Sequence, residues 1–181
     1  VTNSLGATST TVYDAASRAV AAINPLGYAT TNVYDAAGQT IAVQDANGKV
    51  TTTVYDPLGR TQAQQSALGH LTTTVYDAAG RTSAYIDARG NRHSFTCDAN
   101  GQRTEVIDPL GRITTATYDP VGQQARRHDP RNYVTTYSYD ASGRSTGRLY
   151  PDGSLVTFAY DEVGNRTRMR DSTGVFSYTY D

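Results

Sequence analysis

The dipeptide Tyr-Asp recurs along this chain at a fixed spacing, and that spacing limits the folds open to it. It occurs eight times, and Cys97-Asp98 occupies a ninth position. The spacing is 21 residues at every step except the last, which is 20 residues. A fixed period of about 20–50 residues marks a repeat architecture in which each copy is one supersecondary unit. We therefore treat residues 1–181 as a single array of about nine repeats.

Each copy contains two places where the chain is predicted to turn. Gly follows the Asp of Tyr-Asp by three residues in almost every copy, and Ser17 takes that position in the first. A second Asx-x-x-Gly falls about half a period later, as from Asp45 to Gly48, and Asn132 replaces the Gly once. Asp at the first turn position accepts backbone N–H bonds, and Gly supplies a positive φ. The pattern predicts three-residue hairpin loops closed by a left-handed residue and a bulge.

The remaining composition favours strands between these turns. All six Pro directly follow the first residue of a turn, and the intervening segments of six or seven residues are rich in Thr, Val and Tyr. The chain has only two Glu, one Lys and one Met, so helix formers are scarce. The fold class predicted is all-β: an antiparallel β-hairpin meander of about seventeen strands. Because open sheets rarely exceed about 10 strands without curling, we expect a long coiling β-strip.

The strand residues are patterned on two faces. Ser or Thr always lies three residues before Tyr-Asp, and an apolar residue such as Val50 or Leu71 usually lies five before. Alternation places these on one face, and the Tyr with the residue two before it on the other. Both faces are only half apolar, which suits a one-layer wall with a wet side.

The repeat resembles the YD repeat of Rhs-type proteins. The match lies in Tyr137-Ser-Tyr139-Asp140-Ala-Ser-Gly143-Arg144, in Phe158-Ala-Tyr160-Asp161-Glu-Val-Gly164-Asn165, and in the Tyr-Asp-x-x-Gly-Arg units that begin at Tyr55 and Tyr76. Similar proteins are Rhs polymorphic toxins, shell-forming subunits of insecticidal toxin complexes, bacterial wall-associated proteins and teneurins. The resemblance implies a β-strip that spirals into a hollow shell, or extends as a scaffold, on secreted or cell-surface proteins. In the toxin members, it implies a shell that encloses a C-terminal toxin domain.

The residues expected to build the repeat form one structural set. They are Tyr13, Asp14, Tyr34, Asp35, Gly38, Tyr55, Asp56, Gly59, Arg60, Tyr76, Asp77, Gly80, Arg81, Asp98, Gly101, Tyr118, Asp119, Gly122, Tyr139, Asp140, Gly143, Arg144, Tyr160, Asp161, Gly164, Tyr180 and Asp181.

No set of residues is nominated for catalysis, a cofactor or a metal. Almost every Asp opens a predicted turn, which explains the abundance of Asp without acid–base chemistry. The Asp-x-x-Gly units lack the alternate acidic residues and distal Glu of an EF-hand. His70, His93 and His128 lie in different copies without ligand spacing. A net charge of −1 gives no support for nucleic-acid binding, and no apolar run is long enough for a membrane span.

Two features leave alternatives open. Cys97 occupies a Tyr position as a smaller residue, and as the single Cys it permits only intermolecular disulfide pairing. Twelve of the sixteen Lys and Arg follow Asp87, either as solvated strand residues or as a surface for anionic glycans or an acidic partner.

The function predicted is structural and non-catalytic: a segment of the wall or scaffold of a larger protein, of which this chain is expected to be a fragment. The expected partners are flanking YD repeats, with an enclosed toxin domain or cell-surface glycans as further candidates. One alternative is a carbohydrate- or partner-binding module that uses the Tyr and Arg rows. Another is a homo-oligomer or filament joined edge to edge, since meander edges carry unpaired backbone groups.

Overall fold

The computed structural model describes residues 8–180, and every helix or strand in that range is a β-strand. The chain divides into two units, residues 1–92 and residues 93–181, and each is described by itself. The first contains β1 (Thr10–Tyr13), β2 (Ala19–Ile23), β3 (Ala29–Tyr34), β4 (Thr40–Gln44), β5 (Val50–Tyr55), β6 (Thr61–Gln65), β7 (Leu71–Tyr76) and β8 (Thr82–Ile86). The second contains β9 (Arg92–Cys97), which begins at the boundary residue, β10 (Arg103–Ile107), β11 (Ile113–Tyr118), β12 (Gln124–His128), β13 (Val134–Tyr139), β14 (Ser145–Leu149), β15 (Leu155–Tyr160), β16 (Arg166–Asp171) and β17 (Gly174–Ser177).

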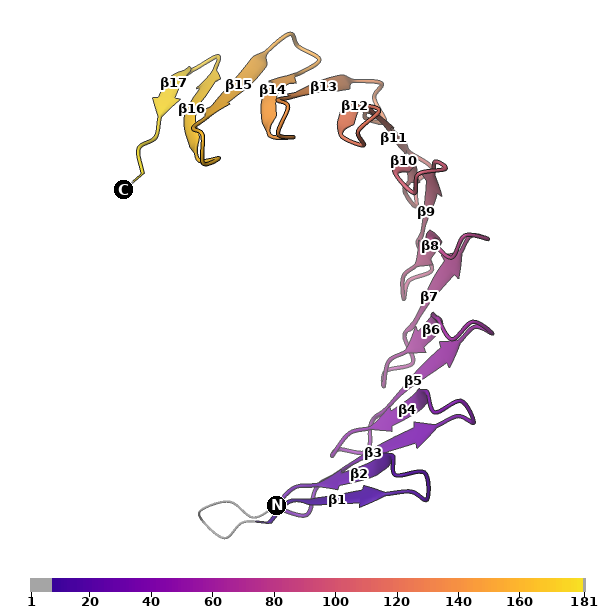
Figure 1. Ribbon diagram of the computed structural model, residues 1–181. Coiled ribbons are helices and arrows are strands. Elements are labelled where there is room, and N and C mark those ends of the chain that lie inside the picture. The colour runs from indigo at the N-terminus through magenta and orange to yellow at the C-terminus, as the bar shows by residue number, and fades with distance from the viewer. Residues whose placement is uncertain (1–7, 181) are drawn as a thin grey trace. The chain divides into compact units, whose positions relative to one another are not determined.

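Within each unit the strands pair antiparallel in chain order (Figure 1), as β3 with β4 and then β4 with β5. The predicted all-β hairpin meander is confirmed. The strands are four to six residues long, slightly shorter than predicted. The reason is that a residue beside the turn, such as His70 before β7, lies outside the strand.

The turns have the backbone conformation that their sequence predicts. In residues 8–180, thirteen turn glycines from Gly27 to Gly164 have φ between 75° and 95°. Ser17 and Asn132, which replace Gly, have φ of 60° and 65°. The predicted left-handed positions are therefore confirmed there, whereas Gly6 lies outside the described residues.

The turn between β16 and β17 differs from the prediction. A three-residue loop closed by a left-handed Gly174 was expected, but Asp171 pairs directly with Gly174, whose φ is 155°. Only Ser172 and Thr173 remain in the loop. The last step of the repeat is one residue shorter than the others because this loop is one residue shorter.

The hairpins that follow Tyr-Asp contain a second irregularity. In the pair β3–β4, Val33 lies opposite Ala42 and Tyr34 lies opposite Thr40, so Ile41 is an extra residue. The same shift recurs in the other Tyr-Asp hairpins of both units. The alternate hairpins, such as β4–β5, are in continuous register. A bulge bends its strand and increases the local twist, so each copy bends at its Tyr-Asp end.

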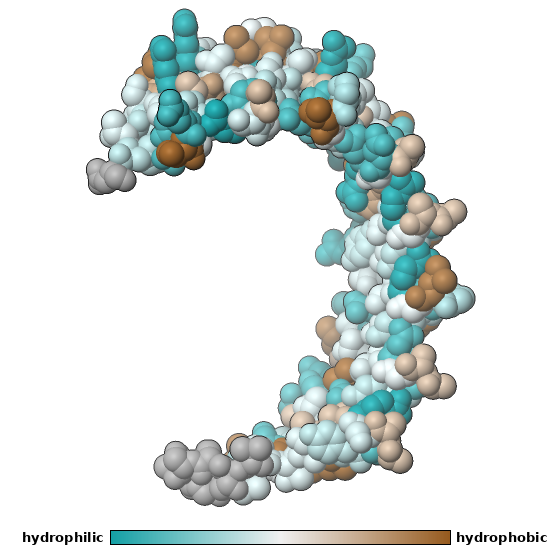
Figure 2. Space-filling model, viewed as in Figure 1, coloured by the Kyte–Doolittle hydropathy of each residue, from teal (hydrophilic) through white to brown (hydrophobic). Residues whose placement is uncertain are grey.

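The sheet is a single layer without a conventional core. Ala84 is the one fully buried apolar side chain among residues 8–180. The register places Val33, Ala42 and Thr52 in one cross-strand row, on the face predicted for Ser and Thr. Val33 remains 51% exposed. Hydrophobic and hydrophilic residues are interspersed over the surface in Figure 2. Stability must therefore come from neighbouring strands and from the turns.

A glycine comparison tests the turn assignment. An added Cβ at Gly101 meets no atom within 4 Å, so Gly101→Ala isolates the cost of a φ of 83°. We expect a loss of about 1–2 kcal/mol in the free energy of unfolding, measured by urea denaturation. Gly147→Ala is the matched control, because Gly147 has no positive φ and its added Cβ makes ordinary contacts at 3.6 Å. Equal losses in the two variants would contradict the assignment.

Candidate functional site

The Tyr-Asp turn is a repeated polar cluster built around one carboxylate. In the turn from Asp56 to Arg60, the N–H of Gly59 donates to the Asp56 carbonyl at 2.9 Å. The N–H of Asp56 donates to the Arg60 carbonyl, also at 2.9 Å. The N–H groups of Leu58 and Arg60 both donate to Oδ1 of Asp56, at 3.0 and 2.9 Å. The side chain thus supplies the acceptor that the backbone of this short loop does not.

The second carboxylate oxygen holds the residue that follows the turn. Oδ2 of Asp56 accepts from Nε of Arg60 at 2.7 Å and lies 2.6 Å from its second guanidinium nitrogen. Asp14 with Arg18 and Asp140 with Arg144 repeat this pairing. Where Asn follows the turn, its amide donates to the same oxygen, as from Asn165 to Asp161 at 3.1 Å. The carboxylate therefore fixes both the loop and the next side chain.

The Arg that follows the turn connects one copy to the next. The guanidinium of Arg60 lies 4.1 Å from the ring centroid of Tyr76, which belongs to the next Tyr-Asp. Arg18 lies over Tyr34 at 4.8 Å, and its guanidinium also donates to the Asp35 carbonyl at 3.1 Å. Such cation–π contacts are worth about 0.5–1 kcal/mol at exposed sites. The contact recurs between Arg144 and Tyr160.

The Tyr hydroxyl connects each copy to the one before it. Tyr55 donates from its hydroxyl to the carbonyl oxygen of Thr40 at 3.0 Å, fifteen residues back in the chain. Thr40 lies beyond the last paired residues of β4 and β5, Ala42 and Thr52. The hydroxyl thus binds a carbonyl beside the bulge. The same bond, at 2.8–3.1 Å, is made by Tyr34, Tyr76, Tyr118, Tyr139, Tyr160 and, fourteen residues back, Tyr180.

The hydrogen bonds lower the pKa of the carboxyl groups at the centre of these turns. Hydrogen bonds from the Arg60 guanidinium and backbone hold the pKa of Asp56 below its ordinary value of 3.8. The backbone N–H of the following Arg is the main cause at Asp77 and Asp140, supported by its guanidinium. These carboxylates are therefore anionic and engaged at neutral pH. Their chemistry is that of hydrogen-bond acceptors.

The predicted repeat residues from Tyr13 to Tyr180 all lie at these turns or directly beside them, and Asp181 lies outside the described residues. They form a row of similar clusters rather than one centre. Sequence reasoning missed Arg18, which Ser17 precedes instead of Gly. Its position one residue after the left-handed site could have revealed it.

The described residues contain no candidate metal site. Residues 8–180 contain no group of three or more His, Cys, Asp and Glu side chains that could hold a metal ion. Cys97 is a free, half-buried thiol. No helix between residues 8 and 180 is long and apolar enough to span a membrane.

The fold and these turns define a tyrosine–aspartate repeat array. The chain matches the family model described as Teneurin YD-shell over residues 1–181, and it belongs to that family. No curated protein matches the chain.

Solved structures share the fold. The crystal structure of TcdB2-TccC3 without its hypervariable C-terminal region is 18% identical, with a TM-score of 0.62 over 96% of this chain. That of TcdB2-TccC3-TEV is 18% identical, with a TM-score of 0.62 over 91%. A mutant Tc holotoxin pore of Photorhabdus luminescens is 16% identical, with a TM-score of 0.50 over 91%. This chain spans only 11–12% of those chains, so the likeness shows the fold of one segment.

Removing one Tyr hydroxyl tests how much its hydrogen bond stabilises the fold. Tyr55→Phe should lower the free energy of unfolding by about 0.5–1.5 kcal/mol, because the Thr40 carbonyl loses its donor. Tyr13→Phe is the control, since Tyr13 is 61% exposed and its hydroxyl has no hydrogen bond within residues 8–180. Chemical denaturation measures both variants. A loss in Tyr13→Phe as large as in Tyr55→Phe would show that the hydroxyl bond is not the cause.

Acid should weaken the array through its carboxylates. Because the folded pKa of Asp56 lies below 3.8, the unfolded chain binds more protons as the pH falls through that value. The contribution of Asp56 to stability is thus complete at neutral pH and is lost below about pH 4. We expect the melting temperature to be level near neutrality and to fall steeply in that acidic range. Asp56→Asn should melt lower at pH 7 but lose less on acidification; an unchanged acid slope would contradict this account.

Proposed function

We propose that this array is a structural, non-catalytic segment of the wall of a hollow shell in a larger secreted or cell-surface protein. The observation that carries the proposal is the copy-to-copy network. The Tyr-Asp turns at Asp14, Asp56, Asp77, Asp140 and Asp161 hold the Arg or Asn side chain that follows, and in three copies that Arg stacks on the next Tyr. The strands in each unit contact only their chain neighbours. A structure that is held together by repeated local contacts can be extended by adding copies, which suits a wall.

The single layer supports the same role. A compact domain needs a second layer to bury the apolar side of its sheet. Here many apolar residues stay half exposed, and the turns are closed by their own backbone hydrogen bonds. Such a strip can enclose a volume while one face remains in contact with contents or solvent. We propose flanking YD repeats as its immediate partners.

The second part of the proposal concerns what the shell contains. The match to the Teneurin YD-shell model and the fold shared with a Tc holotoxin pore support a shell that encloses a C-terminal toxin domain of the same polypeptide. Surface display without a cargo is the alternative. Both roles place the array outside the cytoplasm.

The test uses the full polypeptide that carries these residues. Electron microscopy should show a hollow particle, and limited proteolysis should leave any enclosed domain intact. The double variant Asp56→Ala with Arg60→Ala should open the wall and expose that domain, whereas Leu58→Ala, at a 77% exposed position of the same turn, should not. A particle without a hollow interior, or equal digestion in both variants, would overturn the proposal.

A further inference from the structure

A row of aromatic side chains in the second unit is interrupted at one strand. The residue two before the Tyr-Asp position is Phe95, Tyr137, Phe158 or Tyr178 in four copies of this unit, but it is Ala116 in β11. Alternation places these residues on the face that carries the Tyr of Tyr-Asp. Among these five copies, the one with Ala116 therefore lacks a ring at this position of that face.

The strand beside this gap carries an Arg without an aromatic partner. Arg127 of β12 lies opposite Ala116 in the register, and one copy later Arg148 of β14 lies opposite Tyr137. The guanidinium of Arg148 lies 5.6 Å from the centroid of the Tyr137 ring. The Arg127 side chain has no such contact, and within residues 8–180 it makes no hydrogen bond or ion pair. Ala in place of an aromatic residue thus leaves an exposed guanidinium without a ring to stack on.

A depression lies beside Ala116, where the ring is missing. It has a volume of about 170 Å³, and its lining includes the apolar side chains of Val106 and Ala116 and the polar residues Arg103, Gln124 and Arg127. A water molecule takes about 30 Å³ in the liquid, and sites for drug-sized ligands measure about 300–1,000 Å³. The depression therefore has room for a ligand with one ring and not for a larger one.

Two of the guanidinium groups that line the depression have no carboxylate partner. One face of the Arg103 guanidinium lies against the ring of Phe95, whose centroid is 4.0 Å away, and its side chain makes no ion pair within residues 8–180. Glu105 also borders the depression, but the register pairs it with Thr115, so alternation places its side chain on the opposite face. The charges of Arg103 and Arg127 are therefore available to an anion.

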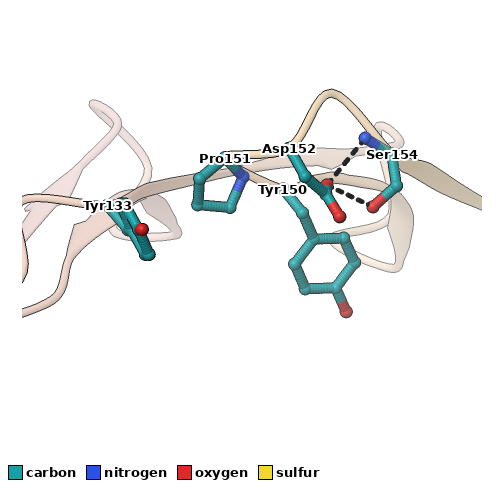
Figure 3. Close-up of a pocket in the computed structure, with 5 residues that line it drawn as sticks. All are labelled: Tyr133, Tyr150, Pro151, Asp152 and Ser154. Carbon is teal, nitrogen blue, oxygen red and sulfur yellow. Dashed lines mark hydrogen bonds between the residues drawn. The ribbon is translucent and has the colours of Figure 1, made fainter.

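A larger depression of the second unit has a different lining. It measures about 540 Å³ and is lined by Tyr133, Tyr150, Pro151, Asp152 and Ser154 (Figure 3). Its charged group is the Asp152 carboxylate, which repels an anion. An anionic ligand therefore favours the smaller depression beside Ala116.

We propose that the depression beside Ala116 binds a small aromatic carboxylate. The ring of the ligand would lie over Ala116 and against the guanidinium of Arg127, in the place that an aromatic side chain takes in the neighbouring copy. Its carboxylate would accept charge-assisted hydrogen bonds from Arg103, whose planar guanidinium matches that group. The amide of Gln124 can donate to the same carboxylate. This binding role is separate from the structural role of a wall segment.

Inorganic phosphate is the main competing ligand, because Arg also binds phosphate oxygens. Phosphate is polar on every side, so it gains nothing from the apolar side chains of Val106 and Ala116. An aromatic carboxylate covers these side chains with its ring and still presents its charge to Arg103. The mixed lining therefore favours the aromatic carboxylate.

The experiment is an NMR titration of the full chain with benzoate, followed through the backbone amide signals of the protein. Three probes separate the two parts of the ligand: benzamide has the ring without the charge, acetate has the carboxylate without the ring, and phosphate is the competing anion. We expect benzoate to bind about tenfold more tightly than each of them, because it alone combines ring and carboxylate. The proposal is overturned if benzoate does not bind, or if one of the other three binds as tightly.

Substitutions then locate the site. Ala116→Phe supplies the missing ring without removing a charge, so it should abolish benzoate binding while circular dichroism shows that the sheet is kept. Arg103→Gln and Arg127→Gln should each weaken binding by about tenfold. Arg126→Gln is the matched control, because Arg126 is equally exposed but lies opposite Thr117, on the other face of the sheet. Benzoate binding that survives Ala116→Phe, or that falls as much in Arg126→Gln as in Arg127→Gln, would also overturn the proposal.

Discussion

The structure depends on a carboxylate that satisfies backbone N–H groups in a three-residue loop. At Asp56, Oδ1 accepts two loop N–H bonds and Oδ2 holds the guanidinium of Arg60. The backbone N–H and C=O groups of a loop need hydrogen-bond partners. In a single-layer sheet, no second layer of protein can supply them. Because this acceptor comes from within the turn, every hairpin can close on its own. The repeat is therefore a series of turns that each supply their own hydrogen-bond acceptor.

These turns make a core unnecessary within each unit. Many apolar side chains are half exposed or more, yet Tyr hydroxyl bonds, and in three copies Arg–Tyr contacts, connect the turns to the adjacent copies. Energetic coupling is thus nearest-neighbour, as in other repeat arrays, and it grows in proportion to the number of copies. The bulge at positions such as Ile41 places a carbonyl where the next Tyr hydroxyl can reach it. The bulge and the regular spacing of Tyr-Asp along the chain both position this contact.

The features that the sequence could predict are the local ones. Asp at a turn opening, Gly or Asn132 at a positive φ and Pro outside the strands specify hairpins from a few adjacent residues. The bond from Tyr55 to Thr40 spans fifteen residues and depends on the bulge, so nothing in the immediate sequence indicates it. The two-residue loop at Ser172 was misread because Asp-x-x-Gly is compatible with either loop length. The shortened final period carried that information, but only the strand register shows where the missing residue lies.

Turns that depart from the repeat are the positions where a side chain can take on a role other than closing the loop. Most turns use the side chain of their first residue as the acceptor of the loop bonds: a carboxylate at the Asp turns, an amide oxygen at Asn24 and a hydroxyl at Ser66. In the turn at Tyr150, Asp152 accepts the Ser154 bonds instead. The first position is therefore not needed as the acceptor, and it carries an aromatic ring beside the exposed ring of Tyr133. A repeated scaffold can in this way place a specific surface on one copy while the backbone of the turn stays the same.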